Sequence, residues 1–208
     1  MVVEPGVIAF LVLVVAYLVA SEGFRRYYEA KFEGFFNTAH YEQALDALNA
    51  IPARVTMTTF RQYYLRFMVY QAQDNEEMAT RMMELLVRMR NSAKRQAQIL
   101  PAAFNYFTQV GNKDRAKETL AQIKGVKGID KAVVQDCQLT YDVVFSKSHA
   151  YIPQMEQLLK TEKNPALQGK LCFLLWKQYA NKGDKGHAKQ YRRRYEELAK
   201  RNTSQQAA

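Results

Sequence analysis

A pair of residues recurs along most of this 208-residue chain at a nearly constant interval. Its second member is an alanine, or once an isoleucine, and an aromatic or apolar residue stands nine positions before it. The second members are 35, 37, 36 and 36 residues apart. A period of about 20–50 residues is typical of proteins that stack one supersecondary unit, because each unit leaves an apolar face that its neighbour covers. The pairs are Phe35–Ala44, Tyr70–Ala79, Phe107–Ala116, Val143–Ile152 and Tyr179–Ala188.

Each unit reads as two helices joined by a short polar turn. An alanine early in the second helix lets the first helix approach closely, and the aromatic residue fills the space beside it. The composition agrees, since 48% of the residues are hydrophobic but only 9 are Gly and 5 are Pro. A second apolar position follows seven residues after each alanine position, and we expect it to be buried. The residues there are Ile51, Leu86, Ile123, Leu159 and Tyr195.

The segment ALQGKLCFLLWKQYANKGDKGHAKQYRRRY, residues 166–195, resembles a tetratricopeptide unit. That family repeats at about 34 residues and uses the same nine-residue spacing. The resemblance covers residues 24–200 and implies an all-α fold, an α-solenoid of about five helix-turn-helix repeats. A generic α-solenoid with longer units is the alternative, because the family prefers small residues twelve positions before each alanine. This chain has Phe32, Phe67, Phe104, Thr140 and Trp176 there.

Residues 7–20, VIAFLVLVVAYLVA, form an apolar stretch near the start of the chain, and residues 5–21 include no charged residue. A membrane-spanning helix needs about 20 mostly apolar residues, with a lower limit near 17. The stretch therefore predicts a transmembrane helix ahead of the repeats. The expected organisation is an anchor over residues 1–23, a repeat domain over residues 24–200 and a flexible tail over residues 201–208.

The flanks of the apolar stretch favour a retained anchor over a cleaved signal peptide. The preceding segment MVVEPG has no Lys or Arg, and residues 18–21 form a poor cleavage site. Arg25, Arg26 and Lys31 follow directly. By the positive-inside rule this side stays in the cytoplasm. We expect a single-pass protein of the cell membrane with its N-terminus outside and its repeat domain in the cytoplasm, while a cleaved signal peptide remains the alternative.

The resemblance also implies a concave groove, lined by the first helix of each unit, that binds protein partners. Cations, aromatics and amides at the matching positions would suit an acidic peptide or helix. The full set of residues with which the family clamps a peptide carboxylate is not present. The implied groove positions are Arg61, Tyr64, Met68, Gln98, Asn105, Cys137, Tyr141, Lys170, Phe173, Lys177 and Asn181.

The net charge of +10 favours anionic partners. A basic patch of Arg192, Arg193 and Arg194 stands near the end of the chain, where Glu196 and Glu197 are spaced to pair with the first two. This patch could meet anionic lipid headgroups or an acidic protein, or it could be the solvated face of a terminal repeat. Nucleic acid is disfavoured, since interleaved aromatics and glycine-rich segments are missing.

No motif of a nucleophile, metal site or nucleotide loop occurs, so we expect neither an enzyme nor a cofactor. His40, His149 and His187 fall in corresponding turns, and Cys137 and Cys172 read as reduced core residues. The expected function is a membrane-tethered adaptor or scaffold. Two alternatives remain: an exported protein that assists folding or envelope assembly, and a receptor on an organelle outer membrane.

Overall fold

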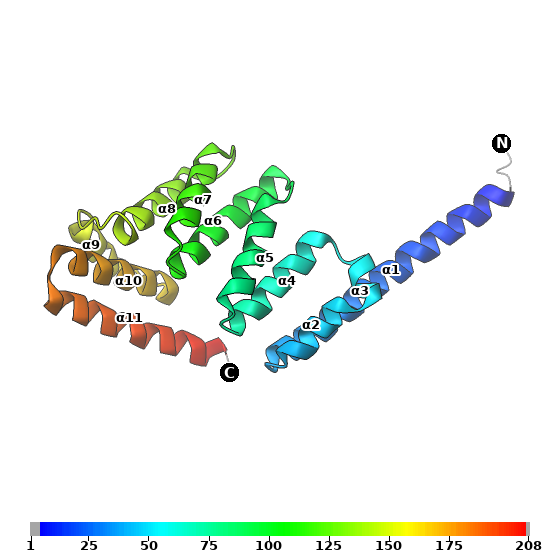
Figure 1. Cartoon of the computed structure of the whole chain (residues 1–208), viewed down its shortest axis with the longest axis horizontal. Helices are drawn as coiled ribbons and strands as arrows, with labels where there is room; N and C mark the ends of the chain where they lie inside the picture. The colour runs from blue at the N-terminus through cyan, green and yellow to red at the C-terminus, as the bar shows by residue number, and fades with distance from the viewer. Residues whose placement is uncertain (1–4, 207–208) are drawn as a thin grey trace. The chain divides into compact units, whose positions relative to one another are not determined.

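The structure is a computed structural model that describes the backbone of residues 5–206 and the side chains of residues 6–200. Within that range the chain forms eleven helices and no strand (Figure 1). The all-helical class expected from the sequence is therefore confirmed. The helices divide into two compact units: Met1–Asn91, which holds α1–α5, and Ser92–Ala208, which holds α6–α11.

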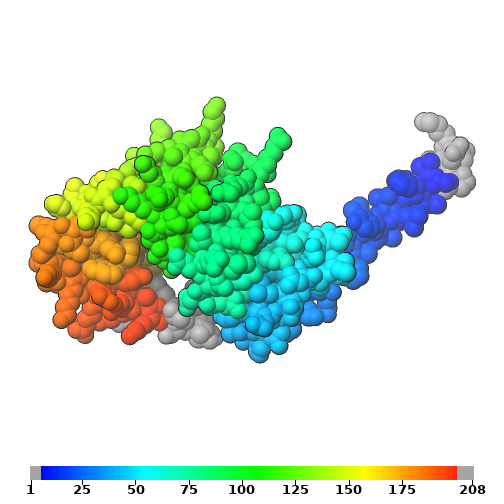
Figure 2. Space-filling view, viewed as in Figure 1, coloured from blue at the N-terminus to red at the C-terminus, as the bar shows by residue number. Residues whose placement is uncertain are grey.

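Helix α1 (Pro5–Asn37) contains the apolar stretch and continues without a break into the first repeat. No boundary separates an anchor at residue 23 from the repeat, because both belong to this one helix. The helix is long and apolar enough to cross a membrane, with a mean hydropathy of 2.3 over 18 residues that are 0% buried. The apolar half of α1 stands clear of the other helices of its unit (Figure 2).

One turn geometry explains the nine-residue spacing. The residue five positions before each alanine position has a positive φ, and in four units the next residue donates its backbone N–H to the carbonyl nine positions before the alanine, at 2.8–2.9 Å. This arrangement is the Schellman motif that ends a helix, so its length is fixed. The second helix starts at once, and the alanine falls in its first turn. The positive φ angles are 58° at Ala39, 53° at Asp74, 74° at Gly111, 56° at Lys147 and 85° at Gly183.

Four of these turns each join two helices into a hairpin, and the two helices of each hairpin pack against each other. Their polar caps recur too, since Asn75, Asn112 and Asp184 each accept a hydrogen bond from a backbone N–H in the first turn of the second helix. All five alanine positions are buried, as predicted, with relative exposures of 0–8%. The hairpins are α1 with α2 (Tyr41–Asn49), α4 (Thr59–Ala72) with α5 (Glu76–Arg88), α6 (Ala93–Gln109) with α7 (Lys113–Gly125), and α10 (Pro165–Lys182) with α11 (Lys185–Gln206).

The first hairpin departs from this pattern after its turn. Helix α2 ends at Asn49, and a short helix α3 (Ile51–Thr56) follows, with Pro52 in its first turn. Ile51 was expected in the core but is 76% exposed. That prediction is wrong because the chain changes direction at Ala50, which turns Ile51 away from the interior. At the matching positions Leu86, Ile123 and Leu159 are buried as expected, and Tyr195 is half-buried.

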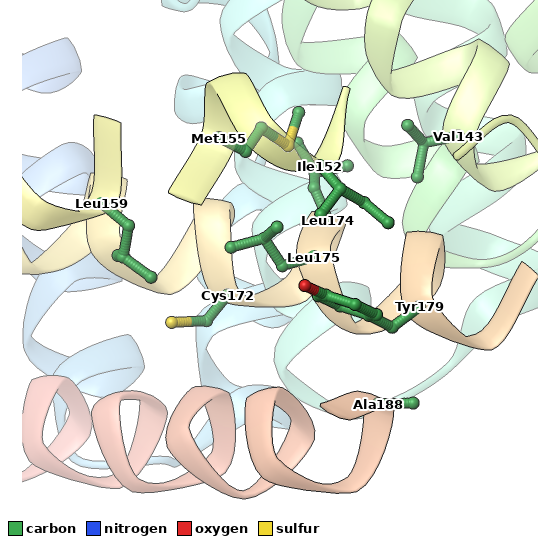
Figure 3. Close-up of a cluster of buried hydrophobic side chains, with 9 residues drawn as sticks. All are labelled: Val143, Ile152, Met155, Leu159, Cys172, Leu174, Leu175, Tyr179 and Ala188. Atoms are coloured by element: carbon green, nitrogen blue, oxygen red, sulfur yellow. The ribbon is translucent and has the colours of Figure 1, made fainter. Parts of the chain in front are cut away.

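The fourth expected repeat does not form a close hairpin. Residues 145–151 separate α8 (Lys131–Val144) from α9 (Ile152–Thr161), and within the described range α9 packs against α10 rather than α8. The core of this region combines side chains of α8, α9, α10 and α11 around Leu174, Leu175 and Tyr179 (Figure 3). The amide of the fully buried Gln178 secures the connection, accepting from the backbone N–H of Tyr151 at 2.9 Å.

Helix α11 continues to Gln206, so most of the segment predicted as a flexible tail from residue 201 has a helical backbone. Residues 207 and 208, and the side chains from residue 201 onward, lie outside the described part.

Candidate functional site

A groove opens within the second unit between α6, α8, α10 and α11. It encloses about 480 Å³ of space and has both apolar and polar walls. Helix α10 supplies four of the nine lining residues, more than any other helix, because residues three and four positions apart share one face of a helix. The lining residues are Asn105, Thr108 and Gln109 of α6, Thr140 of α8, Lys170, Phe173, Leu174 and Trp176 of α10, and Tyr195 of α11.

Three aromatic rings form the apolar wall. Phe173 meets Trp176 edge-on, with ring centroids 5.8 Å apart, and it meets Tyr195 at 5.6 Å. The rings of Trp176 and Tyr195 stack at 6.4 Å. All three side chains are half-buried, so each ring still offers part of its surface to the groove. Such partly exposed aromatic clusters are the usual anchors of protein interfaces.

Cations surround the aromatic wall. The ammonium of Lys177 lies 4.6 Å from the ring centroid of Trp176 and 5.6 Å from that of Phe173. The guanidinium of Arg192 lies 5.3 Å from the centroid of Trp176. These cation–π contacts hold positive charge beside an apolar surface. Lys170, at the other end of the groove, pairs with Asp136 of α8.

Two buried threonines, Thr108 and Thr140, also belong to the lining. Thr108 is 8% exposed and Thr140 is 6% exposed. Neither buried hydroxyl oxygen has a hydrogen-bond partner within the described residues. Buried hydroxyls normally find a partner, so this pair departs from the pattern of an ordinary core.

A carboxylate on α9 links that helix to α10 and α11. Glu156 of α9 accepts hydrogen bonds from the hydroxyls of Tyr179, at 2.7 Å, and Tyr191, at 2.9 Å. The hydroxyl of Tyr179 lowers the pKa of Glu156, and the bond from Tyr191 adds to the effect. Burial, followed by the bond to Glu156, raises the pKa of Tyr179 to about 12. The cluster fixes α9 and α11 against α10, the helix that supplies the largest share of the groove lining.

The structure brings several predicted groove residues of the second unit together. Asn105, Lys170 and Phe173 line the groove, and Lys177 covers its aromatic wall. Asn181 has a different role, because its amide donates to the carbonyls of Val143 at 2.9 Å and Ser148 at 3.0 Å and so holds the α8–α9 connection.

The remaining groove candidates of this unit lie elsewhere. Gln98 is exposed near the start of α6. Tyr141 packs against Phe145, with ring centroids 5.3 Å apart. Cys137 is buried and free, as is Cys172, and burial raises the pKa of the Cys137 thiol to about 11.

Arg61, Tyr64 and Met68 belong to the first unit and make local contacts there. Arg61 of α4 pairs with Glu29 of α1 at 3.2 Å. The ring of Tyr64 stacks on that of Phe60, and Met68 packs against the core of its unit. The prediction joined these residues to a single groove, whereas the described groove consists of residues of the second unit alone.

The basic patch on α11 is exposed and partly neutralised. The expected pairs are confirmed, with Arg192–Glu196 at 2.8 Å and Arg193–Glu197 at 3.0 Å. Arg192 also reaches the ring of Trp176, which connects the patch to the groove. Arg194 is exposed on the same helix.

Six lining residues of the groove were not predicted from the sequence, namely Thr108, Gln109, Thr140, Leu174, Trp176 and Tyr195. Trp176 was noted only as a bulky residue at a position where the tetratricopeptide family prefers small ones, and Tyr195 was expected in the core by analogy with the other units. The available signal was the run Phe173, Trp176 and Lys177, whose spacing puts two rings and a cation on one helix face.

Among the described residues, no group of three or more His, Cys, Asp and Glu side chains could hold a metal ion. No protein-family model, curated protein or solved structure matches the chain.

Proposed function

We propose that this chain is a membrane-tethered adaptor. Helix α1 holds it in a bilayer, and its tetratricopeptide-like second unit binds an acidic segment of a partner protein. The observation that carries the proposal is the groove of about 480 Å³ with its wall of Phe173, Trp176 and Tyr195 and its neighbouring cations. Ligand pockets typically measure about 300–1,000 Å³, so this groove would accept a few residues of a peptide.

The chemistry of the groove favours a segment that alternates apolar and acidic side chains. An apolar side chain would cover the aromatic wall, while carboxylates would meet Lys177 and Arg192, whose charges are held beside that wall. Because residues 92–208 contain 21 Lys and Arg against ten Asp and Glu, long-range attraction would favour the encounter.

Trp176 gives a direct assay, because it is the only tryptophan of the chain. The full-length protein in lipid nanodiscs would be titrated with a Glu–Leu repeat peptide and, in parallel, with a matched Lys–Leu peptide. We expect the acidic peptide alone to shift the emission of Trp176, with an affinity that falls as salt is added.

Two charge reversals on neighbouring helices provide the control. Lys177→Glu should weaken binding of the acidic peptide about tenfold, which corresponds to roughly 1.4 kcal/mol. Lys189→Glu changes an exposed lysine of α11 outside the groove and should leave the affinity within about twofold. Equal responses to both peptides, or equal losses in both variants, would refute the groove as the binding site.

The side of the membrane on which the groove lies is tested separately. The proposed topology has the N-terminus outside and residues 24–208 in the cytoplasm, which follows from Arg25, Arg26 and Lys31 after the apolar stretch. A C-terminal reporter active on one side only, together with the size of the mature product, would test this arrangement. An outward-facing reporter or a shortened product would instead support an exported protein; an organelle outer-membrane signal would support a receptor there.

A further inference from the structure

Helix α3 (Ile51–Thr56) presents two large apolar side chains to the outside of the first unit. Ile51 is 76% exposed and Val55 is 69% exposed. They stand four residues apart and therefore share a face of the helix. The opposite face is buried, since Ala53 is 0% exposed and Met57, just beyond the helix, is 4% exposed. Ile51 is more exposed than any large apolar side chain described in α1, where the highest value is 70% at Leu13.

This exposed face lies close to the end of the apolar stretch of α1. Helix α3 lies beside α1 (Figure 1). Ala53 and Met57 share a core with Phe32 of α1. Ala50, at the start of α3, borders the same small hollow as Tyr28. Tyr28 comes eight residues after Ala20, which is about 12 Å along a helix axis.

The length of the apolar stretch brings this region to the lipid surface. The 14 residues from Val7 to Ala20 span about 21 Å, which is shorter than a hydrocarbon core of about 30 Å. A short span draws its flanking residues toward the bilayer or thins the bilayer around it. Phe24 and Tyr27, which are 50% and 59% exposed, supply side chains suited to that interfacial zone.

We propose that α3 is a second membrane contact, in which Ile51 and Val55 enter the boundary between headgroups and acyl chains of the bilayer that holds α1. The exposed Arg54 lies between them in the sequence and would reach the headgroup phosphates. This inference rests on the proposed anchoring of α1. Two contacts would fix the tilt of the first unit on the membrane, where a single helix would leave it free to rotate.

Site-specific labels test the contact in the full-length chain reconstituted in mixed phosphatidylcholine–phosphatidylglycerol vesicles. Single cysteines at Ile51→Cys and Val55→Cys would carry an environment-sensitive fluorophore. Both native thiols are buried and their pKa values are raised by burial, so the introduced thiol reacts first. Leu11→Cys reports the anchor, and Gln71→Cys, at the far end of α4 from α3, reports water.

We expect labels at positions 51 and 55 to be quenched by nitroxides placed at shallow depth in the lipid. Iodide in the water should quench them several-fold less than the label at position 71. The label at position 11 should respond to deep nitroxides.

The other outcomes separate the two proposals. If position 11 is in lipid while positions 51 and 55 are quenched by iodide, α3 does not touch the membrane although the anchor stands. Protection from both iodide and nitroxides would show a protein surface, such as a second copy, over α3 and would overturn the inference. Quenching of position 11 by iodide would remove the anchor and this inference together.

Discussion

The two units share the same turns but differ in surface chemistry. Residues 1–91 contain nine Lys and Arg against ten Asp and Glu, whereas residues 92–208 contain 21 against ten. Exposed apolar side chains show the opposite distribution. Of the large ones exposed in the described part, fourteen lie in the first unit and two, Leu158 and Leu167, lie in the second.

The shared turns constrain some positions of the chain, and the surface chemistry of the two units differs at the others. The turn residues and the buried alanines recur in both units because they set how two helices meet. The outward positions are not constrained in this way. They give the first unit a face suited to lipid and the second a basic surface around an aromatic groove, which is the division of roles that the proposed adaptor needs.

Lysine substitutions on the two sets of exposed apolar residues should produce the largest contrast. Leu11→Lys with Val15→Lys places two charges within the apolar stretch of α1. Each costs about 2.5–3.5 kcal/mol at the centre of a membrane helix, so the protein should leave the alkali-resistant membrane fraction. Leu158→Lys with Leu167→Lys is the matched control and should leave that fraction unchanged. Retention of the α1 variant in the membrane would contradict the proposed anchor.

The shared features were predictable from the sequence because they depend on local geometry. Phe107 and Ala116 stand nine residues apart since a Schellman turn has a fixed length, so their spacing could be recognised without a structure. The exposure of Ile51 could not be recognised in the same way. It depends on the end of α2 at Asn49, which shifts the residue from its expected register.

Only those groove residues whose position follows from local helix geometry were predicted. Lys170 and Phe173 could be placed on the inner face of a helix by analogy with the tetratricopeptide family. By that analogy each unit would contribute its first helix to the groove in the same way. In the structure, residues 145–151 separate α8 from α9, and α9 packs against α10. Which residues meet around Trp176 follows from that tertiary arrangement, which no local pattern contains.

Removing one carboxylate from each unit tests how differently the units are held together. Glu156→Gln keeps an acceptor but loses the charge that two tyrosine hydroxyls contact. We expect a loss of about 1–3 kcal/mol at pH 7, since bonds to a charged acceptor are worth more than neutral ones. Glu29→Gln breaks the partly exposed pair with Arg61 and should cost about 0–1 kcal/mol.

Lowering the pH should destabilise the folded chain in the same way as the Glu156→Gln substitution. The pKa of Glu156 is lowered from 4.5 in the folded chain, so its contribution to stability is complete above about pH 4.5 and is lost as the pH falls through the lower folded value. Hydrogen exchange of α9–α11 amides in the nanodisc-bound chain, measured at neutral and acidic pH, would follow this loss. The Glu156→Gln variant should show a flatter pH dependence, and an unchanged dependence would rule out Glu156 as its source.

The smallest contrast concerns the turn that both units share. Gly111 and Ala39 occupy the same position, with φ of 74° and 58°. A left-handed conformation costs a residue with a Cβ about 1–2 kcal/mol, while glycine loses about 0.4–1 kcal/mol more in unfolded-chain entropy than alanine. Gly111→Ala should therefore destabilise its hairpin by roughly 0.5–1 kcal/mol, and Ala39→Gly should stabilise the first hairpin by a similar amount.

The space around Gly111 makes this a test of backbone conformation alone. Apart from its own two neighbours in the chain, a Cβ added there would meet no atom within 4 Å, so overlap with the rest of the fold does not contribute to the expected loss. Amide exchange in α7 for the first variant and in α2 for the second would measure the two effects with opposite signs. Effects of the same sign would show that the two turns are not equivalent, and the common register inferred for the two units would then fail at its most regular element.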